Sequence, residues 1–218
     1  TMPFVTGSSA ARTDGERRTY RSPRREQQAR ETREALLTAA TTLFTTRGWA
    51  ATGMRDIARE AGVATETIYT HFASKADLLQ RAIDVAVVGD DQPVAVAERP
   101  EFAALGSGDR ADRIAAAVRM VVDIQVRTAA FARVLREAAP TDETIAATLH
   151  ATRERQRRDV DAGAALVMGR PPDATVRDGL WALLSPEVYL LLVEESDWSV
   201  ERYAAWLAAL VDATIPPD

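Results

Sequence analysis

Apolar residues recur three and four positions apart through most of this chain, and that spacing places them on one face of an α-helix. In the first part of the sequence the pattern predicts helices over about 26–47, 54–61, 65–72 and 75–88. A stretch broken by glycines and prolines follows at 89–108 and is the best candidate for a domain boundary. The predicted fold class is all-α.

Helical patterning resumes after this boundary. A helix that is apolar almost all round is predicted from Asp109, with a short break at Arg127-Thr128, and Thr141 is expected to cap the next long helix. At Ser185-Pro186 the serine can cap a new helix with proline at its first position, or the proline can kink a continuing one. A last helix is predicted from Ser199.

The best-defined local pattern lies at residues 52–79. A small residue at Ala58, a turn glycine at Gly62 and an apolar residue at Ile68 follow the spacing of a helix-turn-helix, whose second helix enters the major groove of DNA. Gly62 is expected to have a positive φ, and Thr52 to cap the first helix of the pair. An ordinary helical hairpin produces a similar pattern, so the spacing alone leaves both interpretations open.

Composition and charge restrict the possible functions. The 218 residues have a formal net charge of −5, but residues 1–81 hold 13 basic and 9 acidic side chains and residues 82–218 hold 14 and 23. A basic first part on an acidic body is expected if only the first part meets phosphate. The chain has no run of apolar residues long enough for a membrane span or for a signal peptide, so a cytoplasmic protein is expected.

The sequence holds little that supports catalysis. There is no cysteine, no glycine-rich phosphate loop and no nucleophile elbow, and the two histidines, His71 and His150, fall in different predicted units. We therefore expect no enzyme, no catalytic residue, no cofactor and no metal site.

The stretch DIAREAGVATETIYTHFASKADLL resembles the DNA-binding domain of the TetR family of bacterial transcriptional regulators. The resemblance covers about residues 28–88, and the remainder only in layout. At Ala64 the family usually has a serine or threonine that caps the recognition helix, and we expect Thr65 to take over that cap. Gly53 is a second departure, at a place often held by a phosphate-binding Ser or Thr. The residues that carry the resemblance are Ile57-Ala58, Ala61-Gly62-Val63, Ile68-Tyr69, His71-Phe72, Ser74-Lys75 and Leu78-Leu79.

The resemblance implies a regulator that binds a double-stranded, pseudo-palindromic operator as a homodimer. In this hypothesis the bases are read by four residues of the second helix, Thr65, Glu66, Thr67 and Thr70. The phosphates are held by Arg55, Tyr69, His71 and Lys75. A basic arm can lie along the phosphates or enter the minor groove, or be a solvated tail; it comprises Arg17, Arg18, Arg21, Arg24 and Arg25.

The body is expected to bind an unidentified, mostly apolar effector and to form the dimer. Candidate lining residues, each of which can also be plain core, are Met120, Ile124, Gln125, Phe131, Leu135, His150, Trp181 and Tyr189. In TetR-like proteins the last two long helices pair with their copies, although here they can instead complete the monomer core. The candidate dimer residues are Leu180, Leu184, Val188, Leu191, Tyr203, Trp206 and Leu210.

The predicted architecture is therefore an N-terminal three-helix helix-turn-helix DNA-binding domain joined to a C-terminal helical ligand-binding and dimerisation body. The expected boundaries are a disordered basic arm at 1–23, the DNA-binding domain with its linking helix at 24–88, and the body at 89–218. The expected function is that of a repressor released by its ligand. The alternative is a helical small-molecule-binding protein or enzyme whose helix-turn-helix is vestigial.

Overall fold

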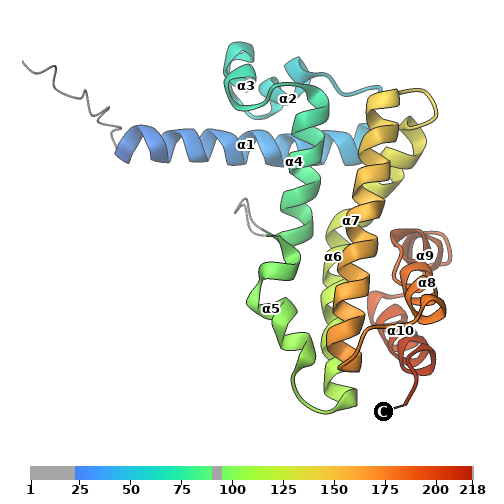
Figure 1. Ribbon diagram of the computed structural model, residues 1–218. Helices are drawn as coiled ribbons and strands as arrows, with labels where there is room; N and C mark the ends of the chain where they lie inside the picture. The colour runs from blue at the N-terminus through green and yellow to red at the C-terminus, as the bar shows by residue number, and fades with distance from the viewer. Residues whose placement is uncertain (1–22, 90–94, 218) are drawn as a thin grey trace, which may run out of the picture.

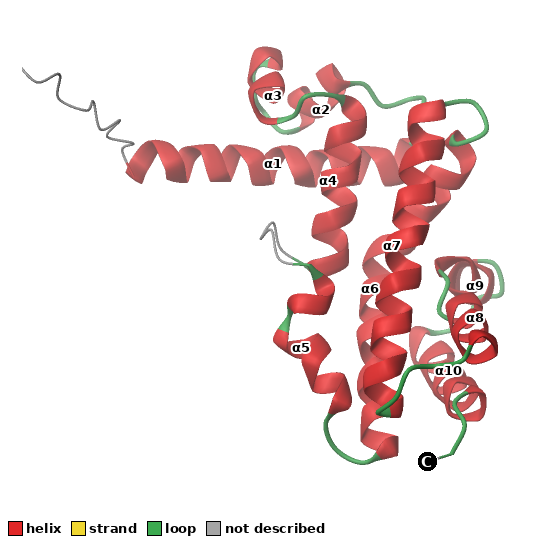
Figure 2. Ribbon diagram, in the orientation of Figure 1, coloured by secondary structure: helices red, strands yellow, loops and turns green. Residues whose placement is uncertain are grey.

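The protein is all-α, as predicted. The structure is a computed structural model that describes residues 23–89 and 95–217, and those residues contain helices and turns but no strand (Figure 2). None of the described helices is both long and apolar enough to cross a lipid bilayer. The helices are α1 (Pro23–Arg47), α2 (Met54–Glu60), α3 (Thr65–His71), α4 (Lys75–Val88), α5 (Pro100–Ala103), α6 (Arg110–Ala138), α7 (Glu143–Met168), α8 (Ala174–Leu183), α9 (Pro186–Tyr189) and α10 (Val200–Thr214), with 3₁₀ turns η1 (Val96–Glu98) and η2 (Ala104–Gly106) and a π-helical turn η3 (Leu190–Glu194).

The two longest helices, α6 and α7, pack side by side and form the spine of the molecule (Figure 1). On one side of this pair lie α4 and α5, and on the other side lie α8, α9 and α10. Helix α1 packs against α2, α4 and α6, so the short helices α2 and α3 sit at one end of the molecule, far from α10 (Figure 1).

A first hydrophobic core joins the N-terminal helices to one end of the spine. Its centre is formed by side chains of α1, α2, α3 and α4, among them the fully buried Phe44, Ile57 and Ile68. The same cluster contains residues of α6 and α7, Phe131, Leu135, Ala138 and Ile145. The N-terminal unit therefore completes its core with side chains of the body.

A second core fills the space between the other half of the spine and the C-terminal helices. It includes the buried residues Ile114 and Val118 of α6, Val167 of α7, Leu180 of α8 and Tyr203 of α10. Burial of such aliphatic and aromatic side chains contributes roughly 1.5–3 kcal/mol each to folding, so these two clusters dominate the stability of the fold.

Several predicted helix ends agree with the structure and others do not. Helix α4 has the predicted limits with Ser74 as its N-cap, and Gly62 has a φ of +70°. The predicted break at Arg127-Thr128 is wrong, because α6 is continuous from Arg110 to Ala138 and the Thr128 hydroxyl donates to the Ile124 carbonyl within the helix (2.8 Å). At Ser185-Pro186 a new short helix begins, with proline in its first turn.

Three expected caps are also corrected. Thr52 does not cap α2; its buried hydroxyl donates back to the carbonyls of Leu43 (3.1 Å) and Gly48 (2.9 Å) and so holds the end of α1. Thr65 is the first residue of α3 rather than its cap, and the N-cap is Ala64, which has no side-chain hydrogen bond. Helix α7 is capped by Asp142, which accepts from the backbone N–H groups of Thr144 and Ile145, rather than by Thr141.

Polar contacts fix α4 and its surroundings to the spine at three points. The indole N–H of Trp49, in the turn after α1, donates to the Asp142 carboxylate between α6 and α7 (2.8 Å). The Arg127 guanidinium of α6 donates to the last carbonyls of α4, Ala86 (2.7 Å) and Val87 (3.0 Å). Arg155 of α7 lies 3.2 Å from the Asp84 carboxylate of α4.

The Trp49–Asp142 contact predicts a pH-dependent contribution to stability. The Trp49 N–H bond, followed by the Ile145 N–H bond, holds the pKa of Asp142 below its ordinary value. A carboxyl group with a depressed pKa in the folded state stabilises the fold above its unfolded-state pKa, and this stability is lost as the pH falls through the folded pKa. We expect Trp49→Phe to lower the urea midpoint at pH 7, and the difference from the parent protein to shrink as the pH is lowered through the range in which Asp142 becomes protonated.

The control is Leu37→Ala, which removes a buried apolar side chain from the same first core and leaves every carboxylate unchanged. Its effect on the urea midpoint is expected to be the same across that pH range. A Trp49→Phe difference that does not change with pH would contradict the assignment.

Candidate nucleic-acid interface and interior cavity

The helix-turn-helix is built on a buried inner side. Ile57 and Ala58 of α2 and Ile68 of α3 have no exposed surface, so the two short helices cross where a small side chain allows close approach. The turn between them closes with a hydrogen bond from the Val63 N–H to the Ala58 carbonyl (2.9 Å), and Gly62 has the left-handed conformation that this turn requires. The predicted geometry of this motif is therefore present.

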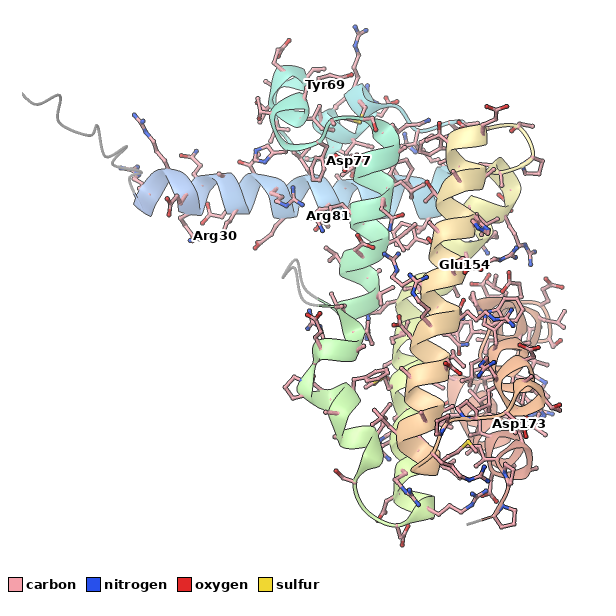
Figure 3. All side chains as sticks on the ribbon, in the orientation of Figure 1. Arg30, Tyr69, Asp77, Arg81, Glu154 and Asp173 are labelled. Atoms are coloured by element: carbon pink, nitrogen blue, oxygen red, sulfur yellow. The ribbon has the colours of Figure 1, made fainter. Side chains whose placement is uncertain are left out.

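The outer side of α3 presents polar side chains. Glu66 and Thr70 are exposed, Tyr69 is 56% exposed, and Thr65, Thr67 and His71 are half-buried. Figure 3 shows Tyr69 at the end of the molecule that α2 and α3 form. The Thr70 hydroxyl donates its proton to the Thr67 carbonyl (2.7 Å). The hydroxyl oxygen of Thr70 can therefore still accept a hydrogen bond, but the hydroxyl cannot donate a second one. The structure thus brings the six expected contact residues of α3 onto one helix of seven residues.

Of the two expected phosphate ligands outside α3, Arg55 is exposed and Lys75 is not. Nζ of Lys75 donates to the backbone carbonyls of Trp49 (2.9 Å) and Thr52 (3.1 Å) and lies 3.7 Å from the centre of the Trp49 ring. Burial lowers the pKa of this ammonium group, while the nearby Asp142 carboxylate raises it. An ammonium has three N–H groups, so at most one is left for a phosphate, and the structure gives Lys75 an internal role that the sequence motif did not reveal.

The expected basic arm is described only in part. Arg24 and Arg25 are exposed in the first turn of α1, whereas Arg17, Arg18 and Arg21 lie outside the described residues. The expected disorder over residues 1–23 also falls outside them, except at Pro23, which begins α1 and so does not belong to a disordered arm.

A partly open cavity of about 190 Å³ lies along the spine. Of the eight predicted lining residues, five contact it: Met120, Ile124, Gln125, Phe131 and Leu135. The other three do not contact it. His150 is exposed on α7, and neither Trp181 nor Tyr189 lines the cavity; Tyr189 is instead packed edge-on against Tyr203 in the second core.

Sequence reasoning missed the part of the lining that comes from outside α6. Ile83 and Val87 of α4, Phe102 of α5 and Leu105 of η2 all contact the cavity, as do α7 residues from Leu149 to Val167. The apolar stripes on α4 and α7 were visible as patterns, but only the tertiary arrangement directs them into the same space.

The charges at the edge of the cavity are mostly paired. The Arg153 guanidinium lies 2.6 Å from the Glu187 carboxylate, and Arg155 is paired with Asp84. Asp159 is a third acidic group in this region; burial raises its pKa, while Arg155 and Arg158 lower it. Among the described residues, no group of three or more His, Cys, Asp or Glu side chains is placed to hold a metal ion.

The predicted dimer residues divide into two groups. Leu180 (2% exposed) and Tyr203 (0%) belong to the monomer core, so their assignment to an interface is wrong. Leu184, Val188, Trp206 and Leu210 are half-buried, and Leu191 is 53% exposed.

The helix-turn-helix resembles those of known regulatory proteins in sequence. Residues 36–82 match the family described as bacterial regulatory proteins, tetR family. The chain is 44% identical over 79 residues to the HTH-type transcriptional activator FasR of Mycolicibacterium smegmatis (34% of each chain), and 44% identical over 61 residues to the HTH-type transcriptional regulator TtgR of Pseudomonas putida (28% of this chain, 29% of that one). The match thus spans about a third or less of these relatives' own length.

The fold extends the likeness to the body. The solved structure of the transcriptional regulator FadR from Bacillus subtilis in complex with stearoyl-CoA aligns over 84% of this chain and 99% of that one, with a TM-score of 0.61 and 16% identity. Identity at that level shows the fold alone. Residues 36–82 therefore match the tetR family of bacterial regulatory proteins in sequence, and the described residues as a whole share the fold of this solved structure.

Proposed function

We propose that the protein is a sequence-specific transcriptional regulator that binds operator DNA as a homodimer and is released by a small molecule held in the cavity. The observation that carries the proposal is the outer side of α3: polar, accessible and supported by a fully buried Ile68 behind it. A helix presented in this way fits the major groove, where base edges offer donors and acceptors that distinguish all four base pairs.

Individual side chains suit different parts of this interface. The methyl groups of Thr65, Thr67 and Thr70 match the methyl group of thymine, and the Glu66 carboxylate can accept from the amino group of cytosine. Arg55 in the first turn of α2, and Tyr69 and His71 in the second half of α3, would hold phosphates and set the position of α3. In a dimer the two α3 helices would read half-sites about one helical turn, or a multiple of it, apart.

The second copy is proposed to pack against α8, α9 and α10. Leu191 is one of only three large hydrophobic side chains more than half exposed among the described residues, and half-buried Val188, Trp206 and Leu210 come from the same three-helix layer. A partner surface would remove this apolar area from water.

The cavity supports the regulatory half of the proposal. The FadR structure shows that this fold can hold a molecule with a long acyl chain. In the present chain Phe131 and Leu135 line the cavity and also belong to the first core, which contains the inner side of the helix-turn-helix. A ligand that binds one arrangement of these helices better than another would shift the population between DNA-competent and incompetent states.

The sign of regulation is proposed to be repression. A dimer on its operator excludes other proteins from that DNA without any further contact, whereas activation needs a surface for the transcription machinery. The alternative function, a helical binding protein or enzyme with a vestigial helix-turn-helix, predicts DNA binding that is governed by salt alone and independent of sequence.

The test is selection of fragments from the genome of the source organism by the purified protein at moderate salt, followed by sequencing. The proposal predicts enrichment of a pseudo-palindrome. On that DNA, Thr67→Ala should weaken specific binding by at least tenfold, because a base contact contributes about 1–3 kcal/mol and both half-sites lose it together. Tyr69→Ala should also weaken it, because both half-sites lose a phosphate contact that sets the position of α3. Thr148→Ala, a half-buried threonine on α7, is the matched control and should bind as the parent does.

Two results would count against the assignment of the outer side of α3 as the surface that contacts the bases. Enrichment without a shared motif would indicate phosphate attraction only and favour the alternative function. Full affinity in both α3 variants would show that other residues read the operator.

The dimer surface is tested by Leu191→Glu, with Val126→Glu on α6 as the control, since the two parent residues are 53% and 54% exposed. A charge buried against a partner is costly, so Leu191→Glu should raise the dimer dissociation constant at least tenfold in sedimentation equilibrium. Val126→Glu should leave it unchanged. If the control variant alone dissociates the dimer, the interface lies on α6 instead.

A further inference from the structure

Among the described residues, four charged side chains line the cavity, and three of them are paired. Arg153 of α7 lies 2.6 Å from the Glu187 carboxylate of α9, and Arg155 of α7 lies 3.2 Å from the Asp84 carboxylate of α4. The fourth is Asp159 of α7, which has neither a hydrogen-bond donor nor an ion-pair partner in the described part of the chain. The cavity therefore has one carboxylate whose charge is not matched by a partner.

Asp159 lies on the side of α7 that α4 and α5 cover. One turn before it, Arg155 reaches Asp84 of α4. One turn after it, the ring of Phe102 of α5 comes so close to Gly163 that a β-carbon there would lie 3.6 Å from it. Residues four positions apart share a helix face, so Asp159 faces the same side as Arg155 and Gly163. This is the side of the spine on which α4 and α5 lie (Figure 1).

A second aspartate of the same helix lies on the other side. Asp161 is half-buried like Asp159, but its carboxylate lies 2.6 Å from the guanidinium of Arg177 on α8, and it does not line the cavity. Two positions along a helix correspond to more than half a turn, which separates the two carboxylates. Asp161 thus has a partner within the protein, whereas Asp159 faces the cavity without one.

The guanidinium groups nearest to Asp159 do not offset its burial. Burial raises the pKa of Asp159, and the charges of Arg155 and Arg158 lower it by less. Arg155 is already paired with Asp84, and Arg158 is exposed. A carboxylate that is partly removed from water without a close partner loses hydration that nothing replaces. A cation inside the cavity would replace it.

The lining around Asp159 is apolar. Val87 of α4, Val96 of η1 and Phe102 of α5 all contact the cavity, and the lining continues along α6 to Phe131 and Leu135 at the first core. Apolar walls favour an apolar body on the ligand. The ring of Phe102, one turn along α7 from Asp159, can also attract a cation that lies over its face.

The paired charges distinguish a cationic ligand from an anionic one. An anionic head group would meet the Asp159 carboxylate, while Arg153 and Arg155 already have their own carboxylates. A neutral ligand would cover Asp159 and leave it without a partner, which adds to the cost of burial. Only a cation gains from the charge of Asp159.

We propose that the cavity takes a mostly apolar molecule carrying one protonated amine, and that this ammonium group donates to the Asp159 carboxylate. A hydrogen bond between two ionised groups is roughly twice as strong as one between neutral groups. This inference rests on the proposed function only in that the same molecule would act as the effector.

The experiment compares three probes with the same alkyl chain and different head groups: decylamine, decanol and decanoate. Their binding to the parent protein is measured at pH 7 by calorimetry, below the concentration at which each probe forms micelles. Decylamine should bind about tenfold or more tightly than decanol, because a hydrogen bond to a charged group contributes more than one between neutral groups. Decanoate should bind most weakly.

The variant is Asp159→Asn, which keeps the shape of the side chain and removes its charge. It should weaken decylamine binding about tenfold or more and change decanol binding by less than about threefold, so that the preference for the amine is lost. Its melting temperature at pH 7 without probe should equal or exceed that of the parent, because burial disfavours the charge of Asp159 more than the guanidinium groups favour it. Asp161→Asn is the matched control and should bind all three probes as the parent does.

Equal decylamine affinity in Asp159→Asn and the parent would show that Asp159 is only a solvated carboxylate at the edge of the cavity, and would overturn the proposal. A lower melting temperature of Asp159→Asn would show that the carboxylate is partnered within the protein and would also overturn it. Tighter binding of decanol or decanoate than of decylamine, or no binding of any probe, would have the same consequence. Operator binding by the same samples without probe is measured in parallel, so a failure of the ligand inference is distinguished from a failure of the regulator function.

Discussion

The interaction on which the rest of the structure depends is the packing of one end of α6 and α7 into the core of the N-terminal helices. Phe131, Leu135 and Ile145 are essentially fully buried, and they lie in the same cluster as Phe44 of α1 and Leu79 of α4. Without them the N-terminal helices α1 to α4 would have only a small core of their own. A unit of that size buries a smaller fraction of its surface and is correspondingly marginal.

This shared core connects the cavity to the helices that carry α3. Ile83, Phe131 and Leu135 each contact the cavity on one side and the first core on the other. Packed interiors are as dense as organic crystals, so a molecule that fills the cavity cannot move these side chains without moving their neighbours. The Arg127 bonds to the end of α4 and the Arg155–Asp84 pair hold α4 to the same spine. The cavity and the inner side of the helix-turn-helix are therefore joined through one hydrophobic cluster.

The sequence predicted local structure far better than it predicted tertiary contacts. Helix α4 and the turn at Gly62 were set by residues within a few positions, and the outer side of α3 followed from the position of Ile68. Roles that depend on distant residues were not visible: Lys75 looked like a phosphate ligand because the carbonyls of Trp49 and Thr52 are brought to it only by folding. Likewise Tyr203 and Leu180 looked like interface residues because nothing in their spacing distinguishes a monomer core from a dimer seam. Gln125 was expected in an effector pocket and does line the cavity, but its amide is held by the distant carbonyls of Leu184 and Ser185, which no local pattern reveals.

The claim that the N-terminal unit and the spine share one core is tested most directly by native-state hydrogen exchange, followed for individual helices at increasing denaturant. The account predicts that the most protected amides of α1, α4 and the adjoining halves of α6 and α7 exchange through a single opening with the same free energy and the same denaturant dependence. A separate opening of lower free energy for α1 and α4, with α6 and α7 still protected, would contradict it. That result would show that the N-terminal helices form an independent domain that only rests on the body.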